Sequence, residues 1–178
     1  MLSLHVETHF CRRCGAAVTD KGGYAYECPQ GHTTYANNTP SAGVILLNDA
    51  NEVLLMKRNI EPFRGTYNIP GGICNFGEAA EAAAVREVAE ETRIQRDQYG
   101  PLQYVCAAID AYPYQGEVLP SLAIVFTARL NGAVVPHIDN ESQAADFLPL
   151  ASLDIEAIRF PAIRQALQLV RDGLTPQA

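Results

Sequence analysis

The stretch GGICNFGEAAEAAAVREVAEETRI, residues 71–94, places three glutamates within five positions of an alanine-rich segment. Alanine has the highest helix propensity, so the segment is predicted to be helical. At about 100° per residue, Glu87, Glu90 and Glu91 fall on one face, opposite an apolar face that contains Val88. Like charges three or four residues apart destabilise a helix by about 0.2–0.5 kcal/mol per pair. The face is therefore either a solvated surface or a site for a hard divalent cation, which prefers carboxylate oxygens.

The composition is typical of one globular domain with a small appendage. The chain has 178 residues, of which 48% are hydrophobic, and a formal charge of −7. This charge disfavours non-specific binding to nucleic acid or to anionic lipid. No apolar run approaches the roughly 20 residues of a membrane span, and the first residues do not resemble a signal peptide. We therefore expect a cytoplasmic protein with no nucleic-acid or membrane partner.

The order of apolar segments predicts an α/β fold. The first two predicted strands are separated by the turn-rich NDAN, which indicates a hairpin. The predicted strands are 41–48, 52–58, 104–112 and 121–130, and the predicted helices are 78–92 and 161–171.

The residues around the carboxylate helix extend the pattern. Pro70-Gly71-Gly72 predicts a tight turn at which the backbone approaches a ligand closely. The segment from Gly72 to Ile94 resembles the signature of the Nudix (MutT-like) hydrolases. Five residues separate Gly72 from Glu78, and seven residues separate Glu78 from REVAEE, which is followed later by Ile94. Every defined position agrees except the last glycine of that signature, which is Arg93 here. The lead-in PFRGTYNIPGG also resembles the family, with Tyr67 where tryptophan is common.

This resemblance implies a fold and a reaction. The family fold is an α/β/α sandwich with a mixed sheet, and its members cleave a diphosphate linkage in nucleoside diphosphate derivatives with Mg²⁺ or Mn²⁺. By resemblance, the metal ligands would be the three glutamates of the helix and a backbone carbonyl of Gly71 or Gly72. Arg86 would orient one of the glutamates by a charge-assisted hydrogen bond.

Further catalytic and substrate contacts are expected outside the signature. NESQAADFLPL resembles the downstream family segment and makes Glu141 a candidate metal ligand or general base, with a plain loop carboxylate as the alternative. The candidate substrate contacts are Arg58, Tyr112 and Tyr114, although aromatic residues at a strand end often serve packing.

The substrate class is predicted by analogy. ADP-ribose or a similar compound such as FAD is the first expectation, and a nucleoside triphosphate is the second. The chain lacks tryptophan and the tryptophan-containing motif of the NADH pyrophosphatase group, so NADH and NAD-capped RNA are not favoured. A catalytically silent nucleotide sensor is the third alternative, but such proteins usually lose signature glutamates, and all are present here.

Residues 1–38 predict a separate zinc ribbon that precedes a Nudix domain at 39–178. Two knuckles joined by a predicted hairpin at 18–27 supply four ligands suited to tetrahedral, structural zinc: Cys11, Cys14, Cys28 and His32. His9 is the rival fourth ligand. Basic and acidic side chains balance in this segment, so it lacks the excess of basic residues that nucleic-acid binding requires. It would instead brace the catalytic domain, form a homodimer interface or line the substrate site.

Arg93 stands where the family has a glycine. Glycine suits the left-handed conformation at a helix end, which costs other residues roughly 1–2 kcal/mol. Either Arg93 adopts that conformation, or the helix continues through TRIQRDQ. We predict the first, because a longer helix would place Ile94 on the glutamate face.

Overall fold

The computed structural model describes residues 8–114 and 116–174. Their contacts divide the chain into two compact units. One unit comprises residues 1–39 and 111–120, and the other comprises residues 40–110 and 121–178. The tip between two long strands thus groups with the N-terminal segment. The division into domains at 1–38 and 39–178 stays a prediction.

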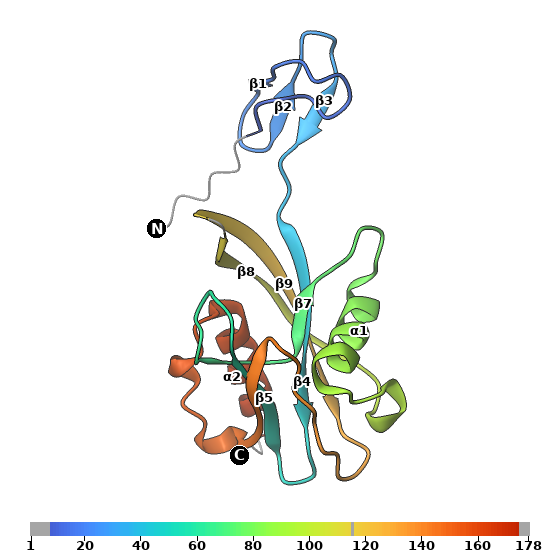
Figure 1. Ribbon diagram of the computed structural model, residues 1–178, viewed down its shortest axis with the longest axis vertical. Coiled ribbons are helices and arrows are strands. Elements are labelled where there is room, and N and C mark those ends of the chain that lie inside the picture. Colours follow the sequence, from blue (N-terminus) through green and yellow to red (C-terminus); the bar gives the residue numbers. More distant parts are fainter. Residues whose placement is uncertain (1–7, 115, 175–178) are drawn as a thin grey trace. The chain divides into compact units, whose positions relative to one another are not determined.

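The N-terminal unit contains a small antiparallel sheet in the order β1-β2-β3 (Figure 1). Its strands are β1 (Thr19–Asp20), β2 (Ala25–Glu27) and β3 (Thr33–Tyr35). The first two form the predicted hairpin. Few side chains of this segment are buried, and Cys11 and Cys28 are among them. A segment of this size needs a metal or another cross-link to remain folded.

The larger sheet has seven strands in the described part of the chain, with a main path β10-β5-β4-β9-β8. The short strand β6 pairs with β5, and the short strand β7 pairs with β4. The bounds are β4 (Thr39–Leu47), β5 (Glu52–Arg58), β6 (Tyr67–Asn68), β7 (Gly71–Ile73), β8 (Gln103–Tyr114), β9 (Glu117–Arg129) and β10 (Ser142–Pro149).

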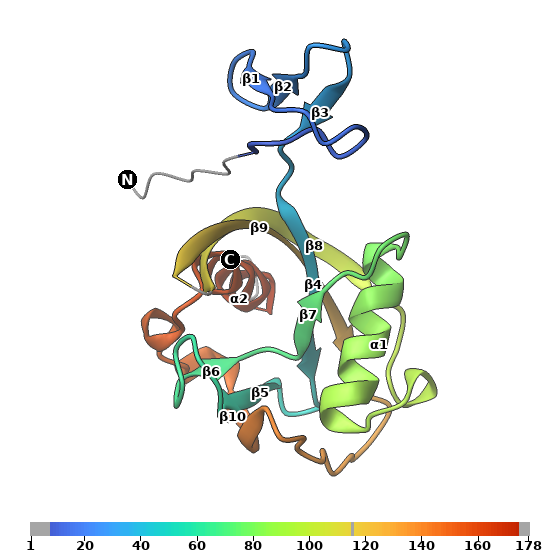
Figure 2. The ribbon, with the colours of Figure 1, turned by 45° about the horizontal axis from the view of Figure 1, so that its top comes forward.

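Helices cover this sheet from two directions. The helical segments are α1 (Ala80–Thr92), η1 (Arg96–Gln98), η2 (Leu150–Ser152), η3 (Ile155–Ala157) and α2 (Pro161–Leu174). Figure 2 shows α1 and α2 on opposite sides of strands β4 and β7. The predicted α/β class is confirmed. None of the described helices is both long and apolar enough to cross a bilayer.

The apolar face of α1 fixes the glutamate face in space. Ala83, Ala84 and Val88 are fully buried and pack in one core cluster with strand residues such as Val44 and Phe126. Because 3.6 residues make one turn, burial of this face turns the opposite face away from the core.

Helix α1 ends as predicted. Arg93 has φ 62° and ψ 6°, the left-handed conformation, and its N–H bonds to Ala89 O at 3.1 Å. Residues 93–95 are not helical, and only a short 3-10 turn follows at Arg96–Gln98. The prediction of a left-handed Arg93 is confirmed.

Two local predictions were wrong. Gly71 and Gly72 belong to strand β7 rather than to a tight turn, because they pair with Gly43 and Ala42 of β4. The segment at Ser142–Pro149, which is not among the predicted strands, is a full strand because β5 pairs with it from Glu52 to Arg58. Tertiary pairing, rather than local pattern, creates both strands.

Candidate active site

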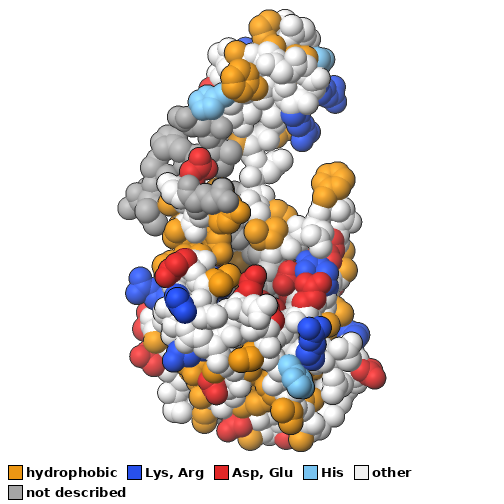
Figure 3. Space-filling model, in the orientation of Figure 1, with side chains coloured by type: hydrophobic (Ala, Val, Ile, Leu, Met, Phe, Trp, Pro, Cys, Tyr) orange, Lys and Arg blue, Asp and Glu red, His pale blue; other side chains and the backbone are white. Residues whose placement is uncertain are grey.

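Arg86 uses every N–H donor of its guanidinium on neighbouring groups. Nε and Nη2 donate to the two carboxylate oxygens of Glu78 at 2.9 and 3.0 Å. Nη1 donates to Glu87 Oε1 at 2.7 Å and to Glu90 Oε2 at 2.9 Å, and Nη2 also reaches Ile73 O at 3.2 Å. A guanidinium has five such donors in a fixed plane, so Arg86 orients three carboxylates at once. Figure 3 shows acidic side chains gathered around basic ones near the middle of the view.

Glu78 anchors Arg86 to the loop before α1. Its Oε2 also accepts the Asn75 N–H at 2.8 Å, and the Glu78 N–H donates to Asn75 O at 3.0 Å. The hydrogen bonds from Arg86, together with the bond from Asn75, lower the pKa of the Glu78 carboxyl to about 2. Glu78 therefore stays ionised at neutral pH and holds Arg86 in place.

Glu87 lies directly against the backbone of β7. A Cβ atom at Gly72 would be 2.6 Å from Glu87 Oε1, closer than such atoms approach in proteins. Gly72 is thus required by the close approach of the Glu87 side chain, whereas the sequence predicted close approach to a ligand. Burial raises the pKa of the Glu87 carboxyl, while the hydrogen bond from Arg86 opposes the rise.

Glu91 is the more deeply enclosed carboxylate of the helix. Its Oε2 accepts the Gly71 N–H at 3.0 Å. Burial raises the pKa of the Glu91 carboxyl to about 8, and the charges of Glu87, Asp139 and Glu141 add to the rise. A carboxyl disfavoured as an anion by burial and by other carboxylates lies in a strongly negative environment, which a bound cation would neutralise.

The donor set of this region suits a hard cation. Carboxylates of Glu87, Glu90 and Glu91 and backbone oxygens offer only oxygen ligands, the kind that Mg²⁺ and Mn²⁺ prefer. The three carboxylates do not converge on one point, however. Glu87 and Glu90 turn toward Arg86, whereas Glu91 turns toward Gly71. Binding of a cation by all three would require rotation of these side chains.

Glu141 lies in the loop before β10, and its charge acts on Glu91. The structure thus brings a residue from a distant segment to the carboxylates of α1. The charge of Asp139 acts on Glu91 in the same way, although Asp139 is not among the site residues predicted from the sequence. The two acidic residues in the segment Asp139-Asn140-Glu141 are the sequence feature that could have identified it.

Asp146, in β10, bonds to Tyr67 across strand β5. The Tyr67 hydroxyl donates to Asp146 Oδ2 at 2.7 Å, and this bond raises the pKa of the tyrosine. Tyr67 and Asp146 thereby join β6 and β10, both of which pair with β5.

The three candidate substrate contacts lie in different environments. Arg58 Nε donates to Pro62 O at 2.8 Å, and its guanidinium lies over the Phe160 ring, 5.5 Å from the centroid. Arg58 Nη2 is buried and has no hydrogen-bond partner among the described residues. Tyr112 and Tyr114 have ring centroids 6.4 Å apart. They belong to the unit that contains the N-terminal segment, whereas the carboxylates belong to the other unit.

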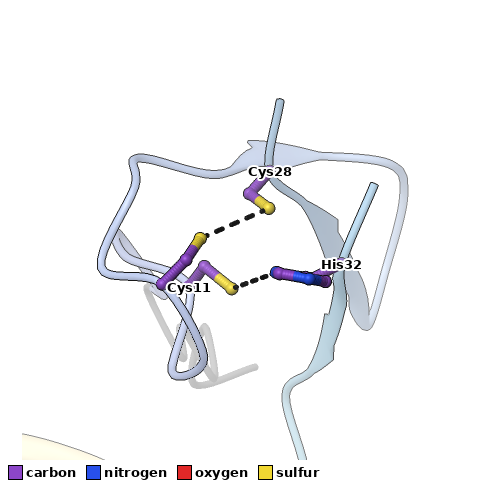
Figure 4. Close-up of side chains that lie close together, drawn as sticks. Cys11, Cys28 and His32 are labelled. Atoms are coloured by element: carbon purple, nitrogen blue, oxygen red, sulfur yellow. Dashed lines mark hydrogen bonds between the residues drawn. The ribbon is translucent and has the colours of Figure 1, made fainter. Parts of the chain in front are cut away.

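The N-terminal unit contains a second cluster, shown in Figure 4. The ligand atoms of four side chains lie within 4.8 Å of one another, and these side chains are Cys11, Cys14, Cys28 and His32. Among the described residues, no other group of three or more histidine, cysteine and acidic side chains meets this spacing. His9, the rival ligand, is not part of the group.

The distances in this cluster agree with tetrahedral coordination. A tetrahedral zinc with Zn–S bonds of about 2.3 Å separates two sulfur ligands by about 3.8 Å and a sulfur and a nitrogen by about 3.6 Å. Cys14 Sγ and Cys28 Sγ are 3.8 Å apart, and Cys11 Sγ and His32 Nδ1 are 3.7 Å apart. Backbone N–H groups of Arg13 and Cys14 lower the pKa of Cys11 to about 6, which favours the thiolate. The cluster is compatible with structural zinc.

The chain thus combines two features: an α/β fold in which helix α1 contacts strand β7, and a Cys3His cluster in the N-terminal unit. Residues 37–168 match the family described as the NUDIX domain, and they make up more than half of the chain. The chain belongs to the Nudix family.

Known proteins agree with this assignment. An ADP-ribose pyrophosphatase of Methanocaldococcus jannaschii is 35% identical over 112 residues, which cover 61% of this chain and 63% of the relative. A putative 8-oxo-dGTP diphosphatase of Bacillus subtilis is 48% identical over 54 residues, 30% of this chain and 34% of the relative. The chain thus spans less than two thirds of the length of either relative.

The fold also agrees with a solved structure. The crystal structure of a NUDIX hydrolase from Nitrosomonas europaea superposes with a TM-score of 0.69 at 24% identity. It covers 94% of this chain and 92% of that one.

Proposed function

We propose that the protein is a metal-dependent hydrolase that cleaves a diphosphate linkage in a nucleoside diphosphate derivative. The observation that carries this proposal is the complete set of signature glutamates, of which Glu78, Glu87 and Glu90 are bonded to an arginine whose donors are all engaged. The like charges of Glu87, Glu90 and Glu91 repel one another along the helix, and a bound divalent cation would relieve that repulsion. Membership of the Nudix family supports the same reaction class.

The residues have separate parts in this reaction. Glu87, Glu90, Glu91 and a carbonyl of Gly71 or Gly72 would hold Mg²⁺ or Mn²⁺, and Arg86 would keep Glu87 and Glu90 within reach. A bound divalent cation supplies neutralisation of the diphosphate charge and acidification of water. Glu141, the candidate base, would accept the water proton while the water oxygen attacks one phosphorus. The P–O bond of the anhydride then breaks, and the second phosphate leaves.

ADP-ribose, or a similar dinucleotide-like diphosphate such as FAD, is the proposed substrate. The ADP-ribose pyrophosphatase among the relatives supports this choice. Arg58, Tyr112 and Tyr114 are proposed substrate contacts. A nucleoside triphosphate is the second candidate, favoured by the strong local identity to a putative 8-oxo-dGTP diphosphatase.

The N-terminal cluster is proposed to hold structural zinc. Four ligand atoms within 4.8 Å of one another support it, and the small buried core of the segment supplies a reason for it. Its role as a brace, as a homodimer interface or as one wall of the substrate site remains part of the proposal.

The test is a substrate panel with the full chain. The purified protein is incubated with Mg²⁺ and ADP-ribose, FAD, NADH or nucleoside triphosphates, and the products are separated by chromatography. We expect AMP and ribose 5-phosphate from ADP-ribose, and no product with Glu91→Gln. Absence of product from every compound would overturn the enzyme proposal and leave the nucleotide-sensing alternative. Binding of the same compounds without turnover would then support that alternative.

A further inference from the structure

Two consecutive carbonyl groups in the loop before β10 are held by one residue, Asn59. Asn59 follows the last residue of β5. Its backbone N–H donates to Glu141 O at 2.7 Å, and its side-chain Nδ2 donates to Asn140 O at 3.1 Å. The backbone bond continues the β5–β10 ladder by one step, whereas the side-chain bond is additional.

The orientation of the Asn59 amide is itself determined by its neighbours. Its Oδ1 accepts Arg64 Nη2 at 3.0 Å, and Gln143 Nε2 lies 3.5 Å away. Both groups are donors, so the oxygen must face them and the nitrogen must face Asn140. The oxygen and the nitrogen of the Asn59 amide therefore each have defined hydrogen-bond partners.

Glu141 is restrained on its other side as well. Its backbone N–H donates to Asp139 Oδ1 at 2.9 Å, an arrangement that fixes a turn. Both backbone groups of Glu141 thus have partners, whereas its exposed carboxylate has no hydrogen-bond or ion-pair partner among the described residues. A rigid backbone beneath an uncommitted carboxylate is the arrangement expected of a group positioned for chemistry rather than for stability.

We propose that Asn59 is a positioning residue for Glu141. It holds the backbone of residues 140–141 so that the Glu141 carboxylate is presented beside Glu91. The inference rests on the proposed function, in which Glu141 is the candidate base. Nothing in the local sequence around Asn59 indicates this role, because the contact depends on the pairing of β5 with β10.

Steady-state kinetics with a double-mutant cycle test the inference. The four proteins are wild type, Asn59→Ala, Glu141→Gln and the double variant. We expect Asn59→Ala to lower kcat about tenfold or more, because a small displacement of a catalytic group is costly, with KM within about twofold. In the Glu141→Gln background the Asn59 substitution should cause no further loss, because it acts only through Glu141.

Asn131→Ala is the matched control. Asn131 lies at the opposite end of the same β9–β10 connection, and its Nδ2 also donates to a backbone carbonyl, Asp97 O, at 3.0 Å. The kcat of the Asn131→Ala variant should remain within about twofold of the wild-type value. An equal loss in Asn59→Ala and Asn131→Ala would indicate general loosening of the connection and would overturn the inference.

Hydrogen exchange separates failure of the inference from failure of the proposed function. Asn59→Ala should increase amide exchange at Glu141, while Asn131→Ala should not. Unchanged exchange at Glu141, or additive losses of kcat in the double variant, would overturn the positioning role even in an active enzyme. A wild-type protein inactive on every diphosphate would overturn the proposed function and, with it, any positioning of Glu141 for catalysis.

Discussion

Arg86 and Glu78 are joined by two parallel hydrogen bonds, Nε to Oε1 at 2.9 Å and Nη2 to Oε2 at 3.0 Å. This fork fixes the plane of the guanidinium, and the remaining donors then reach Glu87 and Glu90. The orientation of two proposed metal ligands therefore depends on a carboxylate that lies outside the helix carrying them.

Arg86→Lys should lower kcat about ten- to a hundred-fold. A lysine ammonium keeps the charge but cannot form the planar fork or reach four groups together. The loss should appear with saturating Mg²⁺, measured as product formed from the preferred diphosphate. Arg129→Lys is the control, because Arg129 bonds to Asn48 and Asn51 in the β4–β5 turn. Full activity in Arg86→Lys would contradict the proposed role of the fork.

Gly72→Ala should weaken binding of the divalent cation by about tenfold or more. The new Cβ would lie 2.6 Å from Glu87 Oε1, so the carboxylate has to move. Mg²⁺ titration of activity and calorimetry with Mn²⁺ both measure the effect. Gly173→Ala is the control: no atom lies within 4 Å of its added Cβ, and helix α2 should gain about 0.5–1 kcal/mol. Equal Mn²⁺ affinity in wild type and Gly72→Ala would refute the prediction.

Arg93→Gly should stabilise the protein by about 0.5–1 kcal/mol in urea unfolding. Arg93 occupies the left-handed region at φ 62°, which costs a residue with a Cβ roughly 1–2 kcal/mol, and the extra freedom of unfolded glycine offsets part of the gain. We expect unchanged kcat, because the substitution lies beyond the last glutamate. A loss of stability would show that the arginine side chain compensates for the backbone conformation.

Asp110→Asn should remove a pH-dependent loss of stability. Asp110 Oδ1 accepts the Ala162 N–H at 2.9 Å in the first turn of α2, and burial raises the pKa of its carboxyl. Because the folded state then holds the proton more tightly than the unfolded state, the contribution of Asp110 to the free energy of unfolding falls as pH rises above about 4. At pH values above the pKa of Asp110 in the folded protein, this stabilisation is absent.

The measurement for Asp110 is the difference in Tm between Asp110→Asn and wild type. It should increase in favour of the variant between pH 4 and pH 7, because asparagine keeps the Oδ1 acceptor without a charge. Asp110→Ala, which lacks the acceptor, should instead lose about 1 kcal/mol. A difference in Tm independent of pH would exclude Asp110 as the titrating group.

Cys28→Ser should reduce bound zinc well below the expected value of about one ion per chain. Loss of one thiolate would weaken coordination of the proposed zinc by the four-ligand cluster. Zinc content is measured by atomic emission after dialysis. Cys106→Ser is the control, since Cys106 is a buried thiol of β8. Zinc content that is zero in wild type as well would overturn the proposed zinc site.

Features with short-range causes were predictable from sequence. Helix periodicity placed Glu87, Glu90 and Glu91 together because they lie within five positions. The left-handed conformation of Arg93 was predictable because a longer helix would have placed Ile94 on the glutamate face. The four-ligand cluster followed from two knuckles in each of which the two ligands are separated by only two or three intervening residues.

Features with long-range causes were not predictable from sequence. The strand β10 has a weak local pattern and forms because β5 offers a partner. Tyr67 meets Asp146, 79 positions away, and Asn59 meets Asn140, 81 positions away, only because that pairing sets their register.

Local sequence is therefore sufficient to identify the family, the glutamate face and the candidate zinc ligands, since each depends on residues whose relative positions one helix or one turn dictates. The orientation of those glutamates, and the residue that holds Glu141, depend on tertiary contacts. Hydrogen-bond partners of this kind depend on strand register and on the close approach of separate segments, and a shift of one residue would exchange every contact.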